Sequence, residues 1–120
     1  MAVNSVLKDK SEAFALRIVN CYKYLTKEKG EYVLSKQLLR SGTSIGANVM
    51  EGIYGQSRAD FLSKLSISLK EAQETGYWLR LLFKSDYLEE SQYQSIYEDC
   101  EEIIKILVST LKSAKDNQIS

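Results

Sequence analysis

Apolar residues recur along most of the chain at alternating spacings of four and three residues, which is the spacing of one face of an α-helix. Short polar or glycine-containing breaks separate four such segments, and none shows the period-two alternation of a half-buried strand. We therefore expect helices over residues 6–29, 33–54, 58–84 and 90–114. Because short connections make neighbouring helices antiparallel, the pattern predicts an all-α, up-down-up-down four-helix bundle, with residues 1–120 as one domain.

Small residues interrupt the apolar faces of the second and third helices. Ser41 and Gly46 lie on the second, and Ser68, Ala72 and Gly76 on the third. A glycine inside a helix costs about 1 kcal/mol relative to alanine, so Gly46 needs a structural reason. The predicted reason is close approach of helices, which makes the second and third helices the closest-packed pair.

The third helix carries more apolar surface than one packed side requires. Ile67, Trp78 and Leu81 lie beside its main seam. Either this helix is deep in the bundle, or its outer face meets another subunit. These three residues are therefore the candidate oligomer interface.

Charge is balanced over the whole chain, with 16 Lys and Arg against 16 Asp and Glu, so no global basic field attracts nucleic acid. Its distribution is uneven. Residues 1–30 hold six basic and three acidic side chains, whereas residues 85–120 hold three basic and eight acidic ones. These segments attract each other within or between subunits, or they form two solvated faces, which is the interpretation we favour.

The amino-terminal residues lack the apolar core of a signal peptide, and no segment is long and apolar enough to span a membrane. We expect a cytoplasmic protein without a membrane partner. In a reducing compartment Cys21 and Cys100 are expected to be core residues, a disulfide being the alternative.

The chain contains no histidine, which removes the commonest general base and the Ser-His and Cys-His pairs. We expect no catalytic residue, no cofactor and no metal, and therefore no enzyme. One carboxylate set, Glu51, Glu71 and Glu74, is the candidate metal site, although ion-paired or solvated faces are far commoner. The glycines near residue 44 lack the spacing of a phosphate-binding loop.

Asn48 lies on the predicted seam of the second helix, where a buried asparagine usually fixes helix register. We expect a structural polar network that joins Asn48, Glu51 and Arg17. A ligand site at the same place is the alternative.

Basic residues of the first helix are candidate phosphate contacts, and eight tyrosines offer stacking surfaces. The interpretation we favour is that the lysines are ordinary solvated side chains and that the tyrosines line the core edge or an interface. The basic candidates are Lys8, Lys10, Arg17, Lys23, Lys27 and Lys29.

Several short runs, taken in order, resemble one known family. The main ones are Ser-Ile-Gly-Ala-Asn at 44–48 and Glu-Thr-Gly-Tyr-Trp-Leu at 74–79, supported by 14–19, 37–41 and 70–72. They resemble the bacterial four-helix-bundle proteins encoded by intervening sequences inside large-subunit ribosomal RNA genes, some of which are labelled ribosomal-protein-like. The signature residues are Arg40, Ser41, Gly46, Asn48, Glu51, Glu74, Tyr77 and Trp78.

The resemblance implies a homopentameric ring. The family also includes the accessory variability protein of diversity-generating retroelements, which works with a reverse transcriptase and nucleic acid through a basic surface. Our first functional hypothesis is a non-enzymatic, self-associating bundle that acts as a scaffold or adaptor for a protein or RNA partner. The alternative is direct binding of RNA or DNA through the basic faces of the first and third helices of a ring.

Overall fold

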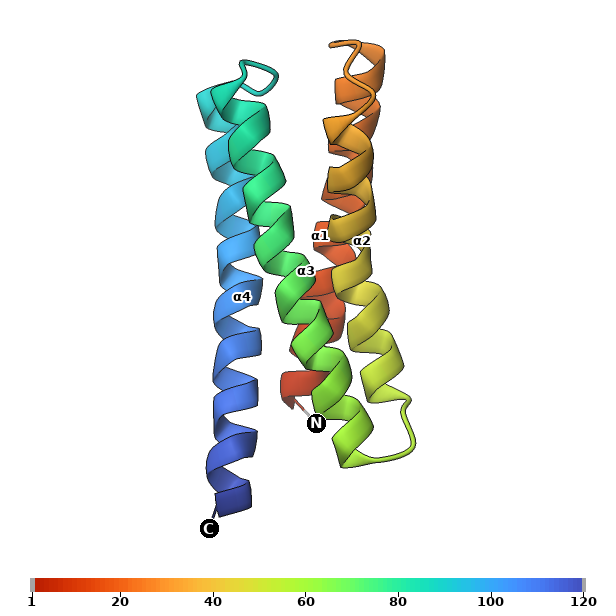
Figure 1. The fold of residues 1–120 in the computed structure, drawn as a ribbon, viewed down its shortest axis with the longest axis vertical. Coiled ribbons are helices and arrows are strands. Elements are labelled where there is room, and N and C mark those ends of the chain that lie inside the picture. The colour runs from red at the N-terminus through yellow and green to blue at the C-terminus, as the bar shows by residue number, and fades with distance from the viewer. Residues whose placement is uncertain (1, 120) are drawn as a thin grey trace.

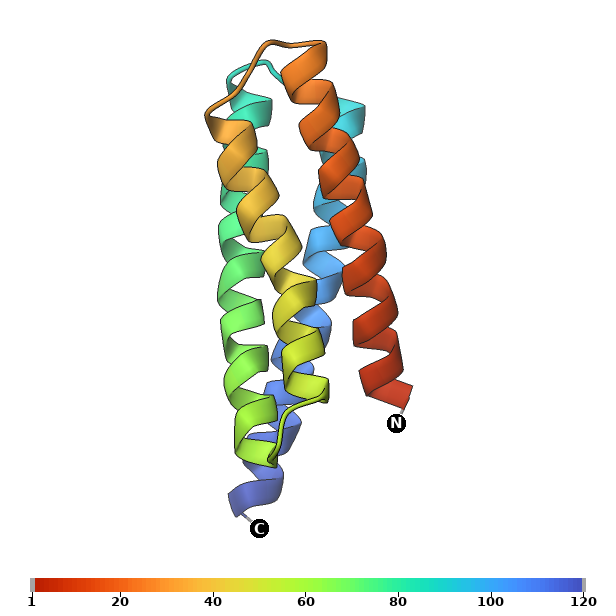
Figure 2. The same ribbon diagram turned by 90° about the vertical axis from the view of Figure 1, so that its right-hand side faces the viewer.

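The computed structural model describes residues 2–119, and the side chains of residues 4–116. Its helices are α1 (Ala2–Lys27), α2 (Leu34–Ile53), α3 (Arg58–Lys84) and α4 (Glu90–Ile119), and no strand occurs among the described residues (Figure 1). Successive helices run antiparallel, so the α1–α2 and α3–α4 connections lie at one end of the bundle and the α2–α3 connection at the other (Figures 1 and 2). The predicted all-α four-helix bundle is confirmed.

Each helix contacts two neighbours, which gives the bundle four sides. The contact between α2 and α3 is the most extensive and that between α1 and α4 the least. The α2–α3 side is therefore opposite the α1–α4 side, and the latter is the loosest seam. The core between the four helices is made of seam residues from every helix, among them Phe14, Ile45, Leu79 and Leu107, each at most 1% exposed.

The bounds of the third helix match the expectation, those of the second differ by one residue at each end, and the first helix starts earlier and ends earlier than expected. The last helix extends to Ile119 rather than to residue 114, because neither glycine nor proline follows Glu90 and Ala114 is buried. The first helix ends at Lys27, and Gly30 then adopts the left-handed conformation, with φ of 65°. The Glu31 N–H closes this turn on the Leu25 carbonyl at 2.9 Å, as in a glycine-terminated helix end.

Small residues do bring α2 and α3 together. Ser68 Oγ donates to the Ile45 carbonyl across the two helices at 2.9 Å, and Thr75 Oγ1 donates to Ser41 Oγ at 2.9 Å. Ser41, Ser68 and Thr75 are fully buried. The prediction that α2 and α3 form the closest pair is confirmed.

The two glycines assigned to that contact face elsewhere. A Cβ atom on Gly46 would lie 3.4 Å from the Ser11 carbonyl of α1, and one on Gly76 would lie 3.6 Å from the Tyr97 ring of α4. The assignment of Gly46 and Gly76 to the α2–α3 contact is wrong. Gly42 makes the tightest approach, because a Cβ there would lie 2.7 Å from Ile18 of α1.

Both cysteines are free thiols. Cys100 is fully buried, and Cys21 is half-buried. Burial raises the pKa of the Cys21 thiol to about 11 and that of Cys100 to about 12. Among the described residues, no helix combines the length and hydropathy needed to cross a membrane.

Candidate functional site

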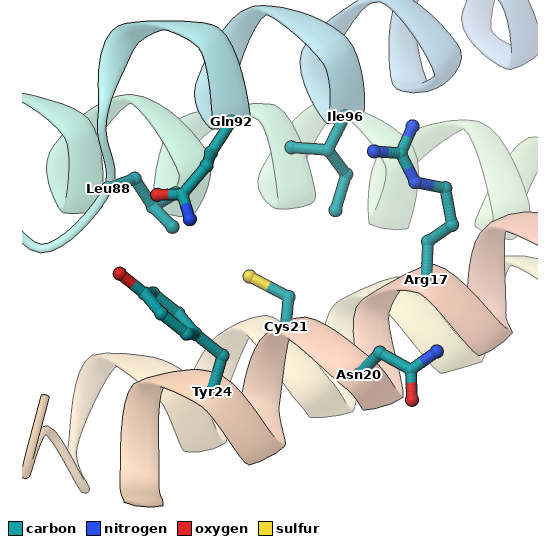
Figure 3. A pocket seen from close by; sticks show the side chains of 7 residues that line it. All are labelled: Arg17, Asn20, Cys21, Tyr24, Leu88, Gln92 and Ile96. Atoms are coloured by element: carbon teal, nitrogen blue, oxygen red, sulfur yellow. The ribbon is translucent and has the colours of Figure 1, made fainter. Parts of the chain in front are cut away.

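A cavity of about 340 Å³ opens on the α1–α4 side (Figure 3). Cys21 and Tyr24 of α1 face Leu88, Gln92 and Ile96, which lie at the start of α4 and just before it. Leu88 and Ile96 are 5% and 4% exposed and provide apolar surface, whereas the glutamine amide adds a polar group. The cavity therefore suits an apolar group with a polar edge.

Ion pairs join α1 to α4 beside this cavity. Arg17 Nη1 donates to Asp99 Oδ2 at 2.7 Å, and its Nη2 donates to Ser95 Oγ at 3.0 Å. Lys10 Nζ pairs with Glu102 Oε1 at 3.0 Å. The basic and acidic segments thus attract each other within one chain, and the favoured interpretation of two separate solvated faces is wrong for these two pairs. Two of the six candidate phosphate contacts, Lys10 and Arg17, are neutralised in this way.

The polar network expected around Asn48 is not formed. Asn48 is half-buried, and its Nδ2 donates to the Ser44 carbonyl of its own helix at 2.8 Å. Glu51 Oε1 pairs with Lys64 Nζ of α3 at 3.1 Å. The prediction fails because Arg17 is turned toward α4, whereas Glu51 faces α3.

Arg40 organises the α2–α3 side. Its Nη1 donates to Glu71 Oε2 at 3.1 Å, and its Nη2 donates to Glu74, which also accepts a hydrogen bond from Trp78 Nε1 at 2.9 Å. The Trp78 hydrogen bond, together with Arg40, holds the pKa of Glu74 below its usual value despite partial burial. The same carboxylates raise the pKa of Arg40.

The candidate metal site does not assemble. Glu71 and Glu74 converge on Arg40, while Glu51 pairs separately with Lys64. No group of three or more potential metal ligands occurs in the described part of the chain. The three carboxylates form ion pairs between helices instead.

Apolar and aromatic side chains surround the Arg40 network. Ile67 is 39% exposed and Tyr77 47% exposed, while Trp78 and Leu81 are half-buried. The Tyr77 and Trp78 rings meet edge to face at 5.1 Å between centroids. The broad apolar surface of α3 is therefore on the outside of the bundle, not deep within it.

The remaining basic candidates are near the two ends of α1. Lys8 Nζ lies 3.4 Å from the Tyr54 hydroxyl and 5.8 Å from the centre of its ring. Lys23, Lys27 and Lys29 are exposed near the α1–α2 connection. Within the described residues these three form no ion pair.

Glu31, which the sequence pattern did not single out, caps the start of α2. The buried Glu31 carboxylate accepts hydrogen bonds from the Val33, Leu34 and Ser35 N–H groups at 3.0, 2.8 and 2.6 Å. These backbone bonds outweigh burial and hold its pKa below the ordinary value. An acidic residue just before a helix was the available signal. The connection holds Tyr32 and Val33, which are 63% and 72% exposed.

Comparison with known proteins identifies the family. A family model described as 23S rRNA-intervening sequence protein matches residues 4–109. The chain belongs to this family. The motif resemblance, which predicted proteins of ribosomal RNA intervening sequences, is thereby confirmed.

One solved structure of this family is very similar. It is the crystal structure of a protein of unknown function from the S23 ribosomal protein family of Bacteroides thetaiotaomicron. That protein is 57% identical, the match covers 92% of this chain and 98% of that one, and the TM-score is 0.90. No curated protein matches the chain.

Proposed function

We propose that this member of the intervening-sequence family is a non-enzymatic, self-associating helical scaffold that works in the cytoplasm with a protein or RNA partner. The observation that carries the proposal is the apolar surface of α3 next to α2. Tyr77 is exposed there in contact with the Trp78 ring, and Ile67 is exposed about three turns earlier on the same helix. The Arg40 hydrogen bonds to Glu71 and Glu74 lie between these two apolar groups. Exposed apolar clusters of this kind are typical of protein contacts.

The bundle offers two unlike surfaces on opposite sides. The α2–α3 side is apolar around an ion-pair network, and the α1–α4 side contains the cavity. A contact between two different surfaces of one chain is head-to-tail, and it closes as a ring when the rotation between copies allows it. The family resemblance favours a ring of five.

The test is the mass in solution. We expect light scattering at micromolar concentration to give a multiple of the 13.7 kDa chain mass, with five copies as the specific expectation. Ile67→Lys should weaken association, because a charge would enter the apolar contact. Val108→Lys, on α4 and similarly exposed at 45%, is the matched control and should not. A wild type of single-chain mass would overturn the proposal.

Direct binding of RNA is the second candidate, and the outer face of α3 favours it. Lys70, Tyr77 and Lys84 are exposed at seven-residue spacing, so they share one face of the helix. Within the described residues, neither lysine forms an ion pair. Basic groups flanking an aromatic ring suit a single-stranded backbone and its bases.

This candidate is tested with a labelled single-stranded RNA. Binding should weaken steeply with added salt, and Lys70→Glu with Lys84→Glu should abolish it. The triple change of Lys23, Lys27 and Lys29 to glutamate tests α1 in the same assay. RNA affinity that is insensitive to salt and to both sets of changes would rule out these surfaces.

A further inference from the structure

The α1–α2 connection presents two apolar side chains in a fixed position. Tyr32 and Val33 are among the most exposed large hydrophobic residues of the described chain. A flexible loop would be expected there, yet three backbone N–H groups bind the Glu31 carboxylate, and Ser35 Oγ donates to the Glu31 carbonyl at 2.9 Å. A loop held in one conformation loses little entropy when it binds, so the apolar pair is preorganised for a contact.

The cavity on the α1–α4 side is lined by Leu88, which follows the end of α3 and precedes α4 (Figure 3). The α3–α4 connection lies at the same end of the bundle as the α1–α2 loop (Figure 1). The cavity lies between α1 and α4, whereas the loop leads from α1 to α2, so the two are on different sides of α1. A volume of about 340 Å³ suits a small apolar group or one to two side chains. Its walls include Leu88 and Ile96, which are apolar, and the amide of Gln92.

The charges beside the two features are complementary. Lys27, Lys29 and Lys36 are exposed beside the loop. Glu89 and Glu90 are exposed immediately after Leu88, which lines the cavity. None of these five side chains forms an ion pair within the part of the chain that the structure describes. The loop is basic only by excess, because Glu28 between Lys27 and Lys29 is also exposed. Lys29 Nζ lies 6.0 Å from the centre of the Tyr24 ring, which lines the cavity. The charges that can pair between copies are therefore Lys27 and Lys36 with Glu89 and Glu90, and their attraction steers two copies into one orientation.

We propose that the Tyr32–Val33 loop of one copy docks into the α1–α4 cavity of a second copy. This inference rests on the proposed self-association and names the surfaces that carry one of its contacts. The loop and the cavity are different surfaces of the same chain, so the contact is head-to-tail. Docking covers Cys21, whose thiol faces the cavity (Figure 3).

The experiment combines a double variant with thiol labelling. Tyr32→Ser with Val33→Ser removes the apolar pair and leaves the backbone bonds to Glu31 in place. We expect association to weaken on the order of tenfold or more, because an apolar anchor in a pocket dominates such contacts. Leu16→Ser is the matched control, since Leu16 is 61% exposed on α1 outside the cavity lining, and it should leave the mass unchanged. Far-UV circular dichroism establishes that the variants are folded, because a melting temperature would also fall when association weakens.

The second readout is the rate at which N-ethylmaleimide labels Cys21, followed by peptide mass spectrometry. Labelling of Cys21 should be slow in the wild-type assembly and should accelerate in the double variant. Cys100 is fully buried and reports unfolding in the same sample. Both rates are measured at one pH, so the raised pKa of the Cys21 thiol affects all samples equally.

The outcomes separate this inference from the proposed function. A wild type of single-chain mass overturns self-association itself. A double variant that assembles like wild type overturns only the docking of the loop. A double variant that dissociates with no change in Cys21 labelling places the loop contact outside the cavity and also overturns the inference. Loss of RNA binding with an unchanged mass would assign the loop to RNA instead, which overturns it as well.

Discussion

The carboxylate of Glu31 stabilises the start of α2, and this makes stability depend on pH. Its pKa is lower in the folded chain than the ordinary 4.5. The stabilisation is therefore fully present above that value and is lost as the pH falls through the folded pKa. We expect Glu31→Gln to cost about 1 kcal/mol at pH 7. In urea unfolding at several pH values, the difference from wild type should shrink in acid; a constant difference would show that the charge is irrelevant.

Substitution by alanine should lower the stability of the protein at Gly42 but not at Gly46. A Cβ at Gly42 would lie 2.7 Å from Ile18, whose branched side chain has little freedom in a helix, so Gly42→Ala should cost about 1 kcal/mol or more despite better helix propensity. At Gly46 the nearest atom would be 3.4 Å away, which is an ordinary contact, so Gly46→Ala should keep or raise stability. Thermal melts of the pair decide this, and a lower melting temperature for Gly46→Ala alone would reverse the assignment.

At the contact between α2 and α3, the buried Ser68 should contribute more to the free energy of unfolding than the exposed Ser66. Ser68 Oγ bonds the Ile45 carbonyl of α2, whereas the exposed Ser66 Oγ bonds Leu62 of its own helix at 3.0 Å. Ser68→Ala leaves a buried carbonyl without that partner and should cost about 1 kcal/mol. Ser66→Ala keeps the packing and should change little. Equal effects of the two in chemical denaturation would mean that the inter-helix bond contributes nothing.

The apolar periodicity predicts the helices and the core face of each, because burial requires one continuous stripe. It does not predict which neighbour flanks that stripe. Gly46 was expected to face α3 but faces α1, and Arg17 was expected to face α2 but faces α4. A small rotation of a helix about its axis decides which neighbouring helix a residue at the edge of the apolar stripe contacts. The Glu31 cap and the cavity depend on backbone geometry at the ends of helices, which a helical repeat does not encode.

On the scale of the whole molecule, the four sides of the bundle are unequally packed. This difference should determine which helices open locally most easily. The α2–α3 side has the most extensive contact and the α1–α4 side the least. Regions with fewer buried contacts open at lower free energy, so in dilute protein the slowest-exchanging amides should lie in α2 and α3. Hydrogen exchange followed by mass spectrometry measures this order, and slowest exchange in α4 would contradict it.

Reversing a charge on the α1–α4 side should increase the difference in hydrogen-exchange rate between that side and the α2–α3 side. Asp99 pairs with Arg17 across the seam, and both side chains are well exposed, at 46% and 40%, so the pair itself contributes at most about 1 kcal/mol. Asp99→Lys replaces attraction with repulsion and should accelerate exchange in α1 and α4 while leaving α2 unchanged. Glu98→Lys is the matched control, because Glu98 is the exposed neighbour on the same helix and has no ion pair among the described residues. If both variants accelerate exchange equally, net charge rather than the Arg17 contact holds α1 against α4.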